Sequence, residues 1–257
     1  MEWFEEIPVG IEGKILSPDR ITTLEEILLK TFGSDIEIVS AGRLRSKKNG
    51  VVHLKLVPAG SEQMDVVAKM FIEGRYENEL SILRVSTQQG LAVPRLLMAQ
   101  DGVILMDFIS GEILVDRINR TFDSELITKL AEWYYKYHTV HRQIKADPRL
   151  RNFICHDDGI VGVDFEESHS GHWMIDIGGV CASLLDTNPI FDSRKRTLSW
   201  HLLDTYLSLI GKKRNSAIET MFITTIADTL KQTATWRNDS RIQQLSEQIR
   251  TKGLPRD

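Results

Sequence analysis

The sequence predicts an α+β protein whose first part is a small antiparallel sheet with one inserted helix and whose second part is mostly helical. Two observations lead to this prediction. Residues 36 to 107 contain five short β-rich runs separated by turn-prone residues, whereas the segments beyond residue 123 carry apolar residues at steps of three and four. The chain of 257 residues, 42% of them apolar, is long enough for two modest lobes.

The first part opens with an amphipathic helix, TTLEEILLKTFG, in which threonines provide the N-cap and Gly33 the stop. Three β-rich runs follow at residues 36–42, 51–57 and 64–72, and the turn-prone KKNG and PAGSEQ between them favour an antiparallel meander. A helix in residues 75–90 and two strands around Asp101–Gly102 complete the predicted five-strand sheet.

The second part begins with a predicted helix in residues 124–143, whose apolar and aromatic positions, including Trp133, Tyr134 and Tyr137, indicate a core helix. Further helices are expected from DIGGVCASLLD onward, and the C-terminal segment from Trp236 is interpreted as a polar helix with a frayed tail. We therefore expect lobes at residues 1–105 and 113–257, joined by a hinge at residues 106–112.

Composition and charge exclude several classes of protein. Lys and Arg number 32 against 36 Asp and Glu, so the net charge of -4 gives no general attraction to nucleic acid or to an anionic membrane. The two cysteines, Cys155 and Cys181, have no C-x-x-C spacing and are too few for a disulfide framework. With neither a secretory signal in MEWFEEIPVG nor a long apolar run, we expect a cytoplasmic protein without a membrane segment.

The segment DPRLRNFICHDDGIVGVDFEES, residues 147–168, gathers acids at the ends of a predicted hairpin. Its apolar runs flank Asp158–Gly159, a strong hairpin turn signal, and this turn would place Phe153 opposite Asp164. Asn152 and Asp164 would then emerge together at the open end of the hairpin. Two oxygen-bearing side chains at one point suit Mg²⁺, and the carboxylate of nearby Asp147 suits the orientation of a nucleophile.

The order DPRLRN followed by VDFE resembles the catalytic loop and metal-binding segment of the protein-kinase-like superfamily, most closely its aminoglycoside phosphotransferase, choline kinase and RIO-type branches. The resemblance covers nearly the whole chain and implies a two-lobed kinase-like fold with ATP in the cleft. It implies that Asp147 accepts or orients the acceptor's proton and that Asn152 and Asp164 hold Mg²⁺. Arg149 stands where many protein kinases carry a phosphate-contacting Lys.

The same resemblance implies three further features upstream, and all three are present. Lys69, in the run DVVAKMF, would hold the nucleotide phosphates, paired with the helix acid Glu79 or, as the alternative, Glu77. Backbone groups of Asp107 and Ile109 would meet the adenine edge. Downstream, Asp176 in HWMIDIGG stands where the family has an acid that braces the catalytic loop.

The sequence departs from the family pattern at two places, and these departures leave alternatives to an active kinase open. Lys145 replaces the family's usual His two residues before the catalytic Asp, and SAGRLRSKKNG lacks the G-x-G-x-x-G pattern of a phosphate-covering loop. A nucleotide-binding pseudokinase or scaffold is therefore the alternative to an enzyme, and a kinase activated by a protein partner is a third hypothesis. A zinc site using His138, His141, His169 and His172 is also compatible with the sequence but lacks any motif.

The short interval between Asp164 and Asp176 holds no room for a long phosphorylatable activation segment. We therefore expect an ATP- and Mg²⁺-dependent phosphotransferase that acts on a hydroxyl-bearing small molecule, or an atypical protein kinase. The stretch EESHSGHWM after Asp164 is where we expect substrate identity to be encoded.

Overall fold

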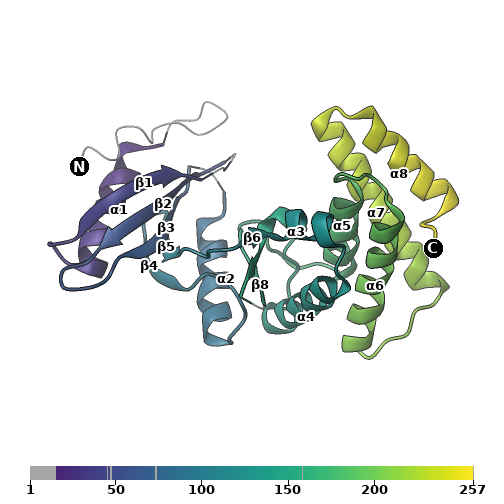
Figure 1. The fold of residues 1–257 in the computed structure, drawn as a ribbon, viewed down its shortest axis with the longest axis horizontal. Coiled ribbons are helices and arrows are strands. Elements are labelled where there is room, and N and C mark those ends of the chain that lie inside the picture. The colour runs from purple at the N-terminus through teal and green to yellow at the C-terminus, as the bar shows by residue number, and fades with distance from the viewer. Residues whose placement is uncertain (1–15, 45, 47, 73, 158, 257) are drawn as a thin grey trace. The chain divides into compact units, whose positions relative to one another are not determined.

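The computed structural model describes residues 16–44, 46, 48–72, 74–157 and 159–256. The segment MEWFEEIPVG therefore lies outside the described residues, as do Arg45, Lys47 and Asp158. The chain divides into two compact units (Figure 1). Unit 1 comprises Met1–Gln88 and Val93–Ile109, and unit 2 comprises Gln89–Ala92 and Ser110–Asp257.

Unit 1 is a five-stranded antiparallel sheet with two helices, and the prediction of five strands with one inserted helix is confirmed. The strand order is β1-β2-β3-β5-β4. Its elements are α1 (Pro18–Phe32), β1 (Glu37–Arg43), β2 (Gly50–Val57), β3 (Met64–Met70), α2 (Tyr76–Gln88), β4 (Leu96–Gln100) and β5 (Val103–Asp107).

The core of unit 1 lies between α1 and one face of the sheet. Alternate residues of β2 and β3 are buried there against the apolar face of α1, which includes Leu24, Ile27 and Leu28. The helix begins four residues before the predicted threonine caps, because Pro18 at its first position already has a helical φ. The predicted stop is confirmed: Gly33 has φ +90°, and its N–H donates to the carbonyl of Leu29.

Unit 2 combines a three-stranded sheet of order β6-β7-β8 with a helical bundle. The helices α4 to α8 are coloured from teal to yellow in Figure 1. Its elements are β6 (Glu112–Ile113), α3 (Leu114–Thr121), α4 (Ser124–His141), the one-turn 3₁₀ helix η2 (Leu150–Asn152), β7 (Phe153–His156), β8 (Gly159–Gly162), α5 (Met174–Leu185), α6 (Ser193–Leu209), α7 (Ser216–Arg237) and α8 (Ser240–Lys252).

The hairpin β7–β8 has a different register from the predicted one. His156 pairs with Gly159 and Phe153 pairs with Gly162, not with Asp164. The turn comes one residue earlier than expected, so Gly159 is the first residue of β8 and the register shifts by two. Side chains keep their faces in a shift of two, and the N–H of Val163 donates to the carbonyl of Asn152 at 2.9 Å. Asn152 and Asp164 therefore still lie at the same end of the hairpin.

Aromatic side chains fill the interior of unit 2 beneath the hairpin. Trp133, Tyr134 and Tyr137 of α4 are buried, as the helical spacing predicts, and Trp133 contacts Phe153 of β7 at a ring separation of 5.0 Å. On the other side, α5 approaches the segment before η2 closely. A Cβ on Gly179 would lie 2.3 Å from Pro148, so glycine is required where the loop rests on the helix.

The C-terminal segment is more ordered than the predicted polar, frayed tail. Asn238 ends α7 in a left-handed conformation, with φ 52°, and Asp239 caps α8. Ile242, Leu245 and Ile249 of α8 are buried against α7.

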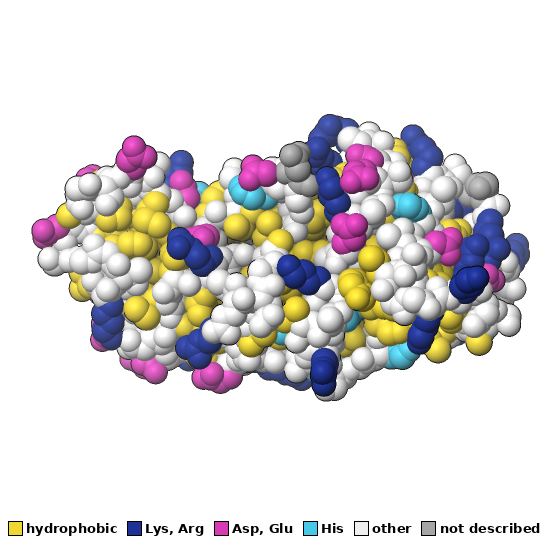
Figure 2. Space-filling view, turned by 90° about the horizontal axis from the view of Figure 1, so that it is seen from below, with side chains coloured by type: hydrophobic (Ala, Val, Ile, Leu, Met, Phe, Trp, Pro, Cys, Tyr) yellow, Lys and Arg dark blue, Asp and Glu magenta, His cyan; other side chains and the backbone are white. Residues whose placement is uncertain are grey.

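Among the described residues, no helix is both long and apolar enough to cross a membrane. On the face drawn in Figure 2, acidic and basic side chains are interspersed, and neither sign dominates.

Candidate active site

The loop from Lys145 to Asn152 is held in place by Asp176 of α5. The Asp176 carboxylate is fully buried and accepts the N–H of Lys145 at 2.6 Å and the N–H of Ala146 at 2.9 Å. His138 of α4 approaches the same carboxylate at 2.9 Å. The expectation that Asp176 braces this loop is confirmed.

Two residues of the site have left-handed backbones although neither is glycine. Ala146 has φ 62° and Asp164 has φ 64°. Such conformations cost about 1–3 kcal/mol each and persist only where the surroundings fix them. For Ala146 the fixing contact is Asp176. The strain lies next to Asp147 and at Asp164, two of the predicted site residues.

Lys145 links the two segments that carry those acids. Its side chain is fully buried, and Nζ donates to the carbonyl of Asp164 at 2.7 Å and to the carbonyl of Asp147 at 3.4 Å. The ammonium also lies 5.3 Å from the ring centre of Phe165 and 5.8 Å from that of Phe153. The residue that departs most from the family pattern therefore ties the loop of Asp147 to the segment of Asp164.

Asp147 is oriented by two side chains of its own loop. Asn152 donates its amide to Oδ2 of Asp147 at 2.9 Å, and Nε of Arg149 lies 3.0 Å from Oδ1. The N–H of Leu150 donates to Oγ of Ser183 on α5 at 3.2 Å, which anchors the loop again. The carboxylate of Asp147 thus has a fixed direction and remains about one-fifth exposed.

The predicted metal ligands have the chemistry that Mg²⁺ requires. The amide nitrogen of Asn152 points to Asp147. The amide oxygen is therefore the atom with which Asn152 can bind a metal. Asp164 adds a carboxylate, so both groups are hard oxygen donors. Both belong to unit 2 and emerge from one end of the hairpin β7–β8.

Beyond Arg149, the C-terminal end of α7 contributes to the same region. The guanidinium of Arg149 lies 4.6 Å from the ring centre of Trp236, and Arg237 forms an ion pair with Asp186 at 2.9 Å. Burial raises the pKa of Asp186, and the cations Arg237, Lys195 and Arg149 act in the opposite direction. The sequence did not predict that these α7 residues lie at the site, since only tertiary packing brings them to the loop.

In unit 1 the predicted cation and acid are joined. Nζ of Lys69 lies 2.6 Å from Oε2 of Glu79, with side chains 8% and 2% exposed. Val66, Ala68 and Met70 of β3 face the core, so Lys69 projects from the opposite face of the sheet. Glu77, the alternative partner, is exposed.

The predicted adenine-contacting positions end unit 1. Asp107 is the last residue of β5, and its side chain is held by Arg95 at 3.0 Å. Its N–H donates to the carbonyl of Arg95 at 3.0 Å and is not available to a ligand. A role for Asp107 and Ile109 in binding adenine therefore stays a prediction.

Histidine geometry gives no support to the zinc hypothesis. Nδ1 of His138 lies 2.7 Å from the hydroxyl of Tyr206, and its Nε2 contacts Asp176, so both ring nitrogens are engaged. His141 packs against Tyr137 at a ring separation of 4.8 Å. These two histidines belong to the packing of α4.

The segment after Asp164 is partly tied to the interior. Glu166 and Ser168 are buried, and the hydroxyl of Tyr137 donates to Oγ of Ser168 at 2.7 Å. His169 exchanges backbone hydrogen bonds with Ile144. Structural packing accounts for much of EESHSGHWM, so its proposed role in choosing the substrate rests on the residues from His169 to His172.

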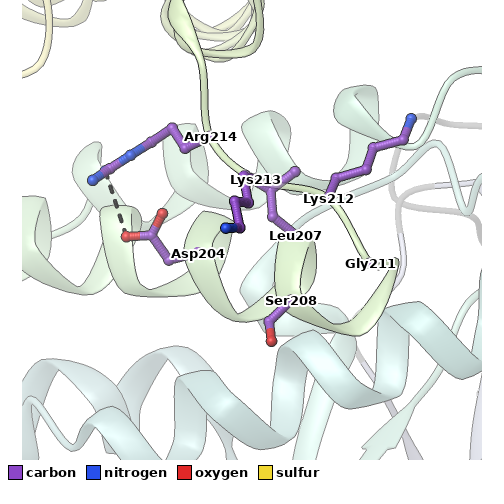
Figure 3. A pocket seen from close by; sticks show the side chains of 7 residues that line it. All are labelled: Asp204, Leu207, Ser208, Gly211, Lys212, Lys213 and Arg214. Atoms are coloured by element: carbon purple, nitrogen blue, oxygen red, sulfur yellow. Dashed lines mark ion pairs between the residues drawn. The ribbon is translucent and has the colours of Figure 1, made fainter.

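A hollow of about 470 Å³ lies elsewhere in unit 2, at the end of α6 (Figure 3). The side chains of Lys212 and Lys213 diverge there, and Arg214 is turned to Asp204, at 3.4 Å. Because its polar groups do not converge, the hollow lacks the arrangement of a built binding site.

Comparisons with known proteins agree with the kinase-like architecture. No protein-family model and no curated protein matches the sequence. An amicoumacin kinase structure is 12% identical with a TM-score of 0.62, covering 91% of this chain and 94% of that chain. A Plasmodium vivax ethanolamine kinase is 9% identical with a TM-score of 0.59, covering 93% of this chain and 90% of that chain.

A gentamicin complex of the aminoglycoside phosphotransferase APH(2″)-IIa is 12% identical with a TM-score of 0.55, covering 87% of this chain and 93% of that chain. At these identities the likeness concerns the fold. The chain has the protein-kinase-like fold of the choline and ethanolamine kinases and the aminoglycoside phosphotransferases, so the predicted resemblance and fold class are confirmed.

Proposed function

We propose that this protein is an ATP- and Mg²⁺-dependent phosphotransferase that transfers the γ-phosphoryl group to a hydroxyl acceptor. The observation that carries the proposal is Lys145, which joins the backbone of Asp147 to that of Asp164 by hydrogen bonds of 3.4 and 2.7 Å. A base and a metal-binding acid must be held together in such a reaction, and here one buried ammonium holds both.

Each of the predicted site residues has a role in the proposed reaction. Asp147 accepts the proton of the acceptor hydroxyl as its oxygen bonds to the γ-phosphorus and the bond to the bridging β–γ oxygen breaks, releasing ADP. Lys69, held by Glu79, contacts the α- and β-phosphates. Arg149 contacts the transferred group, and Asp107 and Ile109 contact the adenine.

Asn152 and Asp164 would hold Mg²⁺ through their oxygens. When bound, the cation neutralises charge that develops on the phosphates. Support from other proteins is of two kinds. The solved structures named above are of two small-molecule kinases and an aminoglycoside phosphotransferase, and one of them, the amicoumacin kinase, was solved with AMP-PNP and Ca²⁺. These likenesses favour a small-molecule acceptor over a protein.

Both cysteines of the chain are buried free thiols, and burial raises the pKa of Cys181 to about 12. Buried thiols outside any disulfide suit a reducing compartment, which we propose to be the cytoplasm.

The proposal is tested by measuring ATP consumption with Mg²⁺ across a panel of alcohols for wild type, Asp147→Asn and Asp164→Asn. Both substitutions should lower turnover about 10²–10⁴-fold without unfolding the protein. Asp157→Asn is the matched control, since its side chain is 87% exposed at the hairpin tip and takes no part in the site. Wild-type turnover in a folded Asp147→Asn protein would reject the proposal.

The pseudokinase alternative predicts a different pattern. It expects tight binding of AMP-PNP, measured calorimetrically, with no turnover by wild type on any acceptor of the panel. Activity that arises only on addition of a cell fraction would instead indicate an activating partner.

A further inference from the structure

We propose that the acceptor is an alcohol that carries an anionic group, which binds a basic shelf formed by Arg149, Trp236 and Arg237. This inference rests on the proposed function and adds the class of the acceptor. All three residues belong to unit 2, and Arg149 lies in direct contact with Asp147, at 3.0 Å.

The shelf begins at the proposed base and extends to the end of α7. Arg149 is clamped between the carboxylate of Asp147 and the indole of Trp236, with 35% of its side chain exposed. Within the described chain no hydrogen bond is donated by its terminal guanidinium nitrogens, and Nε lies 3.0 Å from Oδ1 of Asp147. A fixed, partly exposed guanidinium with donors to spare is suited to a carboxylate, phosphate or sulfonate.

The charges around the shelf favour an anion. Arg237, whose side chain is 44% exposed, is anchored by Asp186, and the buried Lys195 lies near the same acid. Lys195 is protonated at neutral pH, since burial lowers its pKa only to about 8. Lys195 is also influenced by Asp192, so the balance of the shelf itself rests on two ion pairs, Arg149 with Asp147 and Arg237 with Asp186. In each pair the guanidinium is the more exposed group, with side chains 35% and 44% exposed against 20% and 4% for the acids.

A cationic alcohol would meet the opposite environment. Choline carries a quaternary ammonium two carbons from its hydroxyl, so placing the hydroxyl at Asp147 would bring that ammonium toward Arg149 and Arg237. The ring of Trp236, 52% exposed, already has a guanidinium over it, which reduces its attraction for a second cation. The indole instead provides an apolar surface beside the guanidinium of Arg149.

The test compares two primary alcohols of the same length, 2-hydroxyethanesulfonate and choline, at equal ionic strength. Acceptor-stimulated ADP release gives kcat/KM for each, and calorimetry with Mg²⁺ and AMP-PNP gives binding of each. We expect 2-hydroxyethanesulfonate to exceed choline about tenfold in both measurements, with the ratio falling as salt rises. A ratio of one or less in the binding measurement would overturn the inference.

Variants locate the effect. Arg149→Gln should bring the ratio of the two alcohols close to one, and using the ratio cancels any loss of transfer common to both. Lys213→Gln removes one exposed cation elsewhere in unit 2 and should leave the ratio unchanged. If the two substitutions changed the ratio equally, the preference would arise from the overall charge of the protein, and the shelf would be rejected. Arg237→Gln is a second variant, with its folding checked by thermal unfolding because it leaves Asp186 without its ion pair.

The failure of this inference can be told apart from failure of the proposed function. Transfer to choline with no binding of 2-hydroxyethanesulfonate refutes the shelf and leaves phosphotransfer standing. Binding of 2-hydroxyethanesulfonate that depends on Arg149, without turnover, supports the shelf while counting against phosphotransfer.

Discussion

Replacing Lys145 by Met tests how the candidate site is held together. The substitution keeps the length of the side chain and its apolar stem among Phe153 and Phe165 but removes the ammonium. The carbonyl of Asp164 loses a donor at 2.7 Å, which costs about 1.5–3 kcal/mol for a charged hydrogen bond. Removing a fully buried charge relieves a desolvation penalty of similar size. The free energy of unfolding should therefore change by no more than about 2 kcal/mol.

Activity should fall even though the two contributions to stability nearly offset each other. The left-handed backbone of Asp164, at φ 64°, is unfavourable by about 1–3 kcal/mol, and the hydrogen bond from Lys145 offsets a comparable amount. Without that bond, the competent conformation falls in population by about 10–100-fold, at about 1.4 kcal/mol for each factor of ten. We expect kcat to fall by this factor and the Mg²⁺ concentration for half-maximal rate to rise.

The assay measures kcat at a series of Mg²⁺ concentrations together with thermal unfolding. Lys145→Gln keeps an N–H donor and should recover part of the rate. Tyr137→Phe is the structural control, because it removes a buried hydrogen bond of 2.7 Å to Ser168 without touching either carbonyl. If Lys145→Met and Tyr137→Phe have the same effect on the Mg²⁺ response, Lys145 contributes only to packing and the reasoning is wrong.

Two further predictions concern stability. Burial lowers the pKa of Lys195 from 10.5 to about 8, so between these pH values the unfolded chain binds a proton that the folded chain does not. The free energy of unfolding of wild type should therefore rise relative to Lys195→Met, by up to about 3 kcal/mol from pH 8 to 10.5, in paired urea titrations. Identical pH slopes for the two proteins would contradict this. Glu79→Leu removes the buried carboxylate beside Lys69 and should lower the free energy of unfolding by about 3 kcal/mol. The double variant Lys69→Met with Glu79→Leu should recover most of the wild-type Tm but none of the turnover. Recovery of turnover in the double variant would show that the pair is structural.

Local patterns predicted the elements whose signal is strong and self-contained. The period of two in β2 and the apolar face of α1 depend on neighbouring residues, and both appear in the structure close to the predicted bounds. The sequence analysis missed the short helix α3 and the strand β6. The strand β6 has only two residues, and it is a strand because it pairs with β7. In α8 the three buried apolar residues are diluted by polar ones, and only contact with α7 gives them a core role.

The candidate site shows the same division between local and distant information. The types and order of Asp147, Asn152 and Asp164 are visible in the sequence, and their hairpin could be placed to within two residues. The left-handed backbones of Ala146 and Asp164 were not visible, because positive φ is uncommon for any residue other than glycine, although aspartate adopts it more often than most. The N–H of Ala146 donates to Asp176, and Lys145 donates to the carbonyl of Asp164; in each case the partner is distant in sequence.

Lys145 illustrates why a departure from a family pattern is not by itself evidence of lost function. What the position requires is a donor that reaches the carbonyl of Asp164 from a fully buried backbone. A lysine meets this requirement with four methylene groups and one ammonium, provided that aromatic rings and carbonyls satisfy the buried charge. Rings and carbonyls are both present here, since Phe153, Phe165 and the carbonyls of Asp147 and Asp164 lie near Nζ. The lysine is therefore compatible with the catalytic role that we propose for this loop, and the rate of Lys145→Gln relative to Lys145→Met measures how much of that role depends on the donor alone.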